Sequence, residues 1–350
     1  MAIGLLFAIF SLSQLIAAPI LGDLSDRYGR RPVLILSLAG TVLSFVMMAL
    51  AQSLAMLFVA RIVDGLSGGN ISTARAYIAD VTEPKDRARA YGLIGAAFGL
   101  GFILGPAISG VLATVSYTAP IWAAAGLTAV AMTMAWIGLP ETVHRTHAGT
   151  GMPFRDLGAM MKRPDLRRVL LMDFVYWFAF AIFQTTFALF VARRFGFDVP
   201  QTGYLFAGFG LLGAVVQGVL IRPVVNRFGD KSTFMLGLVC AATGLIAATL
   251  AHSVALFTLA LVPLALGIGF GHPTMSSLVS RAARDHEQGR VQGAASAVES
   301  LGRTIGPLWG SASLQRFGES MPYISAAACL MMALIISLGY QVTDSKTAIG

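Results

Sequence analysis

Long apolar runs alternate with short polar segments along the whole of this 350-residue chain. A helix that crosses a bilayer needs about 20 mainly apolar residues, and eleven runs reach that length. Polar backbone and charge are too costly in hydrocarbon, so the polar segments must turn outside the lipid. We predict an all-α membrane protein with eleven transmembrane helices, at about 3–22, 32–51, 54–79, 90–114, 118–139, 167–191, 201–221, 232–251, 254–279, 291–313 and 320–341.

The composition supports an integral membrane protein. Hydrophobic residues make up 56% of the chain and charged residues 12%, against about 25% charged in soluble domains. The net charge of +8 could indicate a nucleic-acid partner, but its distribution argues against one. Of the Lys and Arg residues, 19 lie in loops on one side of the predicted spans, 3 on the other and 3 within spans. The side that is rich in Lys and Arg is expected to be cytoplasmic, and it contains the turn at 22–32.

An internal repeat relates the two halves of the chain. At an offset of 200 residues, segment 27–31 (RYGRR) matches segment 227–231 (RFGDK). At an offset of 201, the glycines and proline of 101–110 match those of 302–310. A repeat in the same membrane orientation needs an even number of spans, and six fits the spacing. The second half has six predicted spans and the first has five, so we expect one further helix ahead of Met1.

This repeat predicts three parts. Residues 1–139 form an N-terminal transmembrane bundle with five of its six helices, residues 140–166 form a cytoplasmic linker, and residues 167–350 form a C-terminal six-helix bundle.

Four motifs carry a resemblance to a known family. They are a charged turn with Gly22, Leu24, Asp26, Arg27, Gly29, Arg30 and Arg31; a glycine motif with Gly101, Gly105, Pro106 and Gly110; Arg61 followed by Gly65; and the segment 139–142 (LPET). Together they resemble the major facilitator superfamily, and within it the drug:proton antiporters that include the tetracycline exporters. The resemblance implies the major facilitator fold of two pseudo-symmetric helical bundles with 12 helices, here without the first. It also implies a monomer in the bacterial inner membrane.

In such proteins the charged turn acts as a cytoplasmic gate. The resemblance assigns this role to Gly22, Asp26, Arg27, Gly29, Arg30 and Arg31, and Asp80 is expected to pair with Arg30. The plainer interpretation is a topological anchor, because arginines hold a loop on the cytoplasmic face. The resemblance likewise makes Gly101, Gly105, Pro106 and Gly110 an antiporter motif, whereas small residues in a span also serve simply for close helix packing.

Five charged residues fall inside predicted spans: Arg61, Asp64, Asp173, Glu299 and Arg303. An unpaired charge there costs about 2.5–3.5 kcal/mol even on lenient scales. The spacing brings Arg61 to Asp64 and Glu299 to Arg303 on one helix face. These pairs either neutralise each other or carry a proton across the membrane, with Asp64 the first candidate, Glu299 the second, and the two arginines modulating them.

The remaining polar residues within spans suggest where a substrate binds. Gln14, Asp173 and Gln184 are candidate substrate contacts, although the amides could equally bond a neighbouring helix, and Asp173 could face the inner vestibule.

We expect a secondary transporter that exports a small amphiphilic compound. A proton gradient is its expected energy source, with no other cofactor and no metal. Proton-linked uptake of a metabolite, and a truncated protein that does not transport, are the alternatives. An enzyme is not expected, since no nucleophile, base and orienting group come together. The ATP-binding Gly-Lys-Ser/Thr loop is also absent from the sequence.

Overall fold

The computed structural model describes residues 1–83, 108–142, 160–283 and 288–340, together with positions 97, 101, 104, 105 and 158. Over these residues the secondary structure is helical and contains no strand, as predicted. Two compact units are formed, one by Leu5–Met152 and the other by Pro153–Gly350 with Met1–Gly4. The predicted boundaries of the linker, at 140 and 166, remain predictions.

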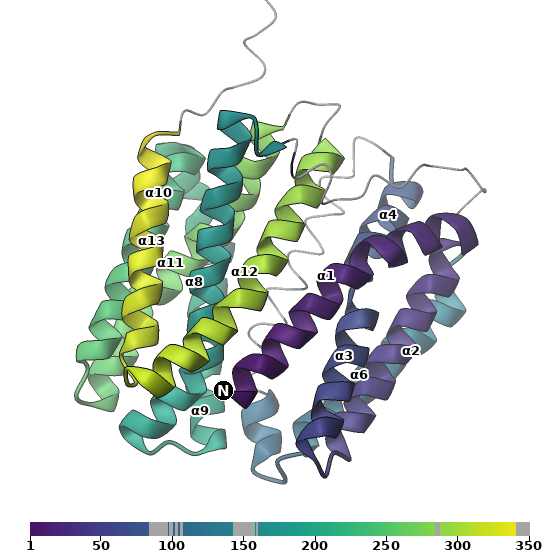
Figure 1. Ribbon diagram of the computed structural model, residues 1–350, viewed down its shortest axis with the longest axis horizontal. Helices are drawn as coiled ribbons and strands as arrows, with labels where there is room; N and C mark the ends of the chain where they lie inside the picture. The colour runs from purple at the N-terminus through teal and green to yellow at the C-terminus, as the bar shows by residue number, and fades with distance from the viewer. Residues whose placement is uncertain are drawn as a thin grey trace, which may run out of the picture. The chain divides into compact units, whose positions relative to one another are not determined.

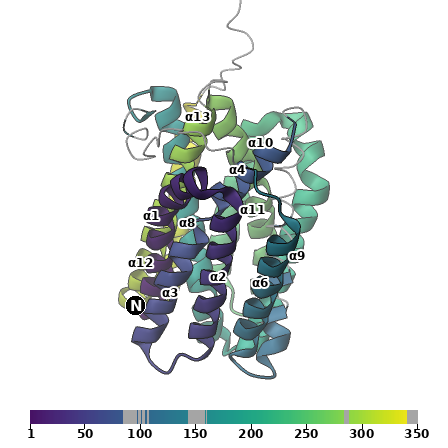
Figure 2. The same ribbon diagram turned by 90° about the vertical axis from the view of Figure 1, so that its right-hand side faces the viewer.

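The N-terminal unit contains α1 (Ala2–Tyr28), α2 (Arg30–Ala49), α3 (Leu54–Gly68), α4 (Ile71–Val81) and α6 (Ala119–Gly138). α2 packs against α3 and α6, and the three lie side by side in Figure 2. Local sequence fixes the helix ends. The hydroxyl of Ser53 accepts a hydrogen bond from the backbone N–H of Met56 at 3.2 Å and so caps α3.

The C-terminal unit contains α8 (Pro164–Phe195), α9 (Val199–Val215), the π-helical turn η1 (Val216–Leu220), α10 (Ile221–Leu250), α11 (Val254–Ala282), α12 (Gln288–Arg316) and α13 (Met321–Leu338). α8 packs against both α12 and α13, as Figure 1 shows. Aromatic rings fill its core: Phe187 and Phe206 lie 4.5 Å apart between ring centroids, as do Phe190 and Tyr323. Large buried rings of this kind make this unit a well-packed bundle.

Ten of the eleven predicted spans coincide with helices. The run 54–79 is divided into α3 and α4, and most of the run 90–114 lies outside the described residues, of which 108–113 are helical.

Within the described part of the chain, eight helical stretches are long and apolar enough to cross a membrane. The number is below eleven partly because 199–250 counts as one stretch, although Gly229 interrupts it with φ 77°. α12 is not among the eight, since its many glycine, serine and glutamine residues, together with Glu299 and Arg303, lower its mean hydropathy. The predicted total of eleven therefore stays a prediction.

Candidate functional site

The turn between α1 and α2 is formed by one glycine. Gly29 has φ 109° and ψ 149°, a conformation that L side chains rarely adopt. The carboxylate of Glu141, which follows α6, lies where a Cβ on Gly29 would be. Its two oxygens accept hydrogen bonds from the backbone N–H groups of Arg30, at 2.9 Å, and Arg31, at 3.2 Å. Glu141 therefore satisfies two of the free donors at the N-terminus of α2 and places negative charge at the positive end of the helix dipole.

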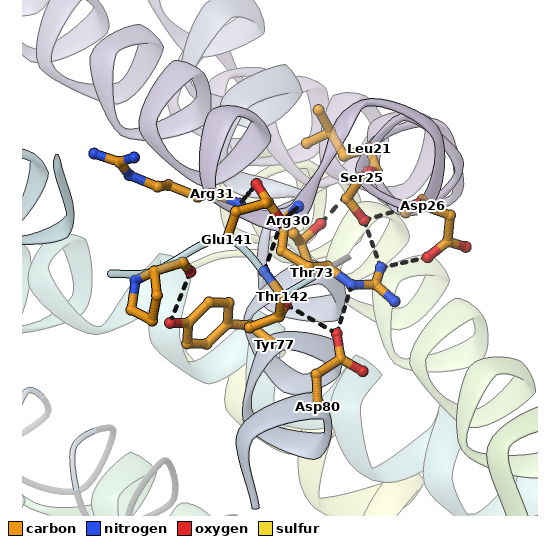
Figure 3. A network of polar contacts seen from close by, with 12 residues as sticks. Leu21, Ser25, Asp26, Arg30, Arg31, Thr73, Tyr77, Asp80, Glu141 and Thr142 are labelled. Carbon is orange, nitrogen blue, oxygen red and sulfur yellow. Dashed lines mark hydrogen bonds and ion pairs between the residues drawn. The ribbon is translucent and has the colours of Figure 1, made fainter. Parts of the chain in front are cut away.

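The side chain of Arg30 joins α1, α2 and α4 (Figure 3). Its Nη1 lies 2.5 Å from Oδ1 of Asp26 and donates to the hydroxyl of Ser25 at 2.7 Å, while its Nε lies 3.2 Å from Oδ2 of Asp80. Only 14% of the Arg30 side chain is exposed. The pairing of Arg30 with Asp80, expected from the sequence, is present in the structure.

The end of α6 completes this network. The hydroxyl of Thr142 donates to Oδ2 of Asp80 at 3.2 Å, and the phenol of Tyr77 donates to the carbonyl of Pro140 at 3.2 Å (Figure 3). Arg31 donates through Nη2 to the carbonyl of Trp136 at 2.5 Å. The ends of four helices, α1, α2, α4 and α6, are thus held together at one point.

Of the other predicted members of the charged turn, Gly22 joins this network through its backbone, because its carbonyl accepts a hydrogen bond from the hydroxyl of Ser25 at 2.7 Å, whereas Arg27 lies outside it. Arg27 pairs with Asp23 at 3.0 Å, and 67% of its side chain is exposed. A Cβ on Gly22 would meet nothing within 4 Å.

A second charged site lies on α3. Nη1 of Arg61 is 3.4 Å from Oδ2 of Asp64, as the i, i+3 spacing predicted. Asp64 is buried, with 6% of its surface exposed, and Ser44 of α2 lies beside its carboxyl. The guanidinium of Arg61 also lies 5.8 and 5.7 Å from the ring centroids of Phe7 and Phe10, within cation–π range. One carboxyl and one guanidinium therefore share a site between aromatic rings and an adjacent helix.

The site on α3 is held close to α1. A Cβ on Gly69 would come within 2.8 Å of the backbone nitrogen of Ala18, so the two helices are in close contact. Gln14 of α1 donates through Nε2 to the carbonyl of Gly68 at 2.9 Å. Of the two interpretations offered for Gln14, substrate contact and a hydrogen bond to a neighbouring helix, this conformation contains the second.

The charged residues of the C-terminal unit lie on α8 and α12. Asp173 is buried, with 1% of its surface exposed. Glu299 interacts electrostatically with both Asp173 and Arg303. The guanidinium of Arg303 lies 5.5 Å from the ring centroid of Trp177. Gln184, the other predicted substrate contact, is half-buried on α8.

The glycine motif is described only in part. Gly101 and Gly105 are helical and exposed, and a Cβ on either would meet nothing within 4 Å among the described residues. Gly110 is helical and buried, and Pro106 lies outside the described residues. In the C-terminal counterpart, by contrast, Gly302, Gly306 and Gly310 pack directly against α8.

Comparison with known proteins decides the family. The family model described as Major Facilitator Superfamily matches residues 1–307, and it matches again at 169–348. The chain belongs to the major facilitator superfamily. It is 36% identical over 310 residues to the tetracycline resistance protein, class G, of Vibrio anguillarum, covering 87% of this chain and 78% of that protein.

Two further proteins match nearly the whole chain. Multidrug resistance protein 1 of Bacillus subtilis is 28% identical, covering 97% of this chain and 87% of the relative. The crystal structure of the human organic anion transporter MFSD10 matches with a TM-score of 0.76 and 26% identity, covering 95% of this chain and 83% of that one. The chain is therefore a multi-pass membrane protein of a transporter family and not an enzyme.

Sequence reasoning missed the roles of Glu141, Thr142 and Tyr77. The segment 139–142 was noted as a superfamily motif, but its function required knowing that the end of α6 lies against the turn at Gly29. No sequence signal marked Tyr77, whose partner is a backbone carbonyl 63 residues away.

Proposed function

We propose that this superfamily member exports a small amphiphilic compound in exchange for protons, by alternating access around a site near the middle of the bilayer. Its similarity to proteins named for tetracycline resistance and multidrug resistance supports export. The glycine motif at 101–110, which resembles that of antiporters, supports exchange over uptake.

The observation that carries proton coupling is the burial of Asp64 beside Arg61. The carboxyl is 6% exposed and the guanidinium is 3.4 Å away, so ionised Asp64 is stabilised mainly by this one cation. Proton uptake by Asp64 neutralises the carboxylate and weakens its hold on Arg61. Because Arg61 also faces Phe7 and Phe10 of α1, this change alters the contact between α1 and α3.

We assign the network around Arg30 to the inner gate of the N-terminal unit. The excess of Lys and Arg on this side of the spans supports a cytoplasmic location in the bacterial inner membrane. Arg30 holds carboxylates from two helices at once, and Glu141 holds the start of α2. Opening requires these charge-assisted bonds to break together, so the network favours the closed state.

The test is transport in proteoliposomes that contain the purified full chain as a monomer and an imposed pH gradient. Tetracycline and the amphiphilic cation ethidium serve as probes. We expect movement of at least one probe to follow the gradient and to stop when an ionophore collapses it. Movement of the probes that is unaffected by that collapse rules out proton exchange.

Asp64→Asn is the diagnostic variant. It should abolish movement driven by the gradient and leave probe binding in place, because the amide keeps the shape but cannot ionise. Asp23→Asn is the matched control, since Asp23 pairs with the exposed Arg27 outside the network, and it should transport like the parent protein. Full activity of Asp64→Asn would remove Asp64 from the role of proton carrier.

A further inference from the structure

α8 and α12 are packed so closely that little fits between them. A Cβ on Gly302 would come within 2.9 Å of the backbone nitrogen of Phe178, and one on Gly306 within 2.8 Å of the Cβ of Ala181. Gly310 continues the contact one turn further on, against Thr186. Since both residue numbers rise together along the contact, the two helices run in the same direction.

This alignment of α8 with α12 brings the carboxyl groups of Asp173 and Glu299 to the same height along the contact between the two helices. Gly302 meets the backbone at Phe174 and Phe178, which centres the contact near residue 176 of α8. Glu299 lies three residues before Gly302, and Asp173 lies three residues before that centre. The two acids also interact electrostatically, as expected for side chains on neighbouring faces.

Asp173 is almost completely buried, with 1% of its surface exposed. Its Oδ2 has no hydrogen-bond partner among the described residues. A buried carboxylate oxygen without a partner is costly, and binding a proton removes the charge and creates a donor. Glu299 is the carboxylate that interacts electrostatically with Asp173, and it is itself only partly buried.

The surrounding charges favour one bound proton. Arg303 of α12 interacts with Glu299, His272 of α11 lies 5.3 Å from the ring of Trp177, and Tyr176 of α8 adjoins Asp173. α9 and α13, which also pack against α8, carry no Asp, Glu, His, Lys or Arg between 199 and 215 or between 321 and 338. Counting the two acids and Arg303, two ionised carboxylates and one guanidinium leave one net negative charge. A single proton brings the cluster to neutrality, the state that a membrane interior favours.

We infer that Asp173 and Glu299 hold one proton between them and form a second proton site, wholly inside the C-terminal unit. The proton is carried on Asp173, and Glu299, the more exposed of the two, exchanges it with water; the only bonds that form and break are O–H bonds. The close contact of α8 and α12 leaves no room for a drug-sized ligand, so Asp173 is reassigned from substrate binding. The role of this site in transport rests on the proposed proton exchange, but its occupancy does not.

Infrared spectroscopy of the full chain in lipid vesicles tests occupancy directly, because a protonated carboxyl has its own carbonyl stretch. We expect the difference spectrum of parent minus Asp173→Asn to contain one protonated-carboxyl component at neutral pH. Asp64→Asn should keep that component. Glu299→Gln should shift the pH at which it disappears, whereas the control Glu319→Gln should not, because Glu319 pairs with Arg194 elsewhere in the unit.

Two results would overturn the inference: an Asp173→Asn spectrum that matches the parent, or a Glu299→Gln titration that matches the parent. Asn is close in shape to the protonated acid, so Asp173→Asn should fold, and an unchanged thermal unfolding temperature checks this. Transport assays separate the two proposals. If the gradient does not drive transport but the infrared component behaves as expected, the proton exchange fails and the proton site stands.

Discussion

The α1–α2 turn of the N-terminal unit and the turn within α10 of the C-terminal unit share one backbone design. Gly29 has φ 109° and Gly229 has φ 77°, and each lies where one helical segment ends and the next begins. In both turns a basic residue two positions later reaches the end of the last helix of its unit. Arg31 donates to the carbonyl of Trp136 at 2.5 Å, and Lys231 to the carbonyl of Tyr340 at 2.6 Å.

The residue directly after each glycine makes an ion pair, but the sign of the charges is reversed. Arg30 lies 3.2 Å from Asp80 in one unit, and Asp230 lies 2.9 Å from Arg281 in the other. The offsets are 200 residues for the first members and 201 for the second, so the pairs occupy equivalent positions. Both turns therefore carry opposite charges at these two positions, in reversed order.

Burial follows position and not chemical type. The side chains after the glycines are 14% exposed for Arg30 and 10% for Asp230, and their partners Asp80 and Arg281 are 34% and 49% exposed. The two units differ in the additional partners of the buried charge. Arg30 has a second carboxylate, Asp26, whereas Asp230 adds a hydrogen bond from the hydroxyl of Ser277 at 3.0 Å. The buried arginine of the N-terminal turn is thus paired with two carboxylates.

Reversing the charge of Arg30 should have the largest effect. Arg30→Asp places a third carboxylate between Asp26 and Asp80 in a partly buried site, at a cost of about 3–5 kcal/mol. We expect a large fall in the thermal unfolding temperature in detergent and loss of transport. Arg27→Asp in the same turn is the control and should change little, because 67% of the Arg27 side chain is exposed.

Adding Asp80→Arg to Arg30→Asp recreates the polarity of the C-terminal turn and should recover part of the lost stability. If the double variant is no more stable than Arg30→Asp alone, the two turns are not equivalent in the way that we describe.

Alanine at the two glycines should separate backbone strain from side-chain contact. Both substitutions place a residue with a Cβ in a backbone conformation that favours glycine, and this strain costs about 1–3 kcal/mol of stability. Gly29→Ala should cost more, since its Cβ collides with the Glu141 carboxylate, whereas a Cβ on Gly229 meets nothing within 4 Å. Thermal unfolding of the two variants measures the difference. Equal losses would mean that Glu141 moves aside without cost.

Removing the more exposed partner of each pair should test redundancy. Arg281→Ala leaves the 10% exposed Asp230 with the Ser277 hydroxyl, and we expect a loss of about 1–2 kcal/mol. Asp80→Ala leaves Arg30 bound to Asp26 and Ser25, and the loss should stay below about 1 kcal/mol. Unfolding temperatures measured side by side give the order, and a larger loss for Asp80→Ala would contradict it.

The same comparison indicates what sequence alone could reach. Runs of apolar residues predicted the helices because hydropathy is a local property, and spacing on one helix predicted the pairing of Arg61 with Asp64. The repeat aligned Asp230 with Arg30, but it did not show that their partners Asp80 and Arg281 are equivalent, since charge reversal removes the identity on which a repeat search depends. Glu141 could not be assigned a role, because its partners are backbone N–H groups more than 100 residues away, and any sequence can supply those.

The smallest effect should come from Glu141→Gln, which tests whether charge or only hydrogen bonding matters at the start of α2. The amide oxygen of Gln can still accept a bond from Arg30 or Arg31, but it lacks the negative charge that favours the positive end of the helix, worth about 0.3–1 kcal/mol. We expect a small drop in unfolding temperature that vanishes at high salt, since exposed electrostatic terms are screened. A drop that persists at high salt would mean that Glu141 stabilises the turn through its second hydrogen bond. The hydrogen bonds of Glu141, and not its charge, would then stabilise the N-terminal turn. The order of the charges at Arg30 and Asp80 could in that case be reversed, as it is at Asp230 and Arg281, without affecting how Glu141 stabilises the turn.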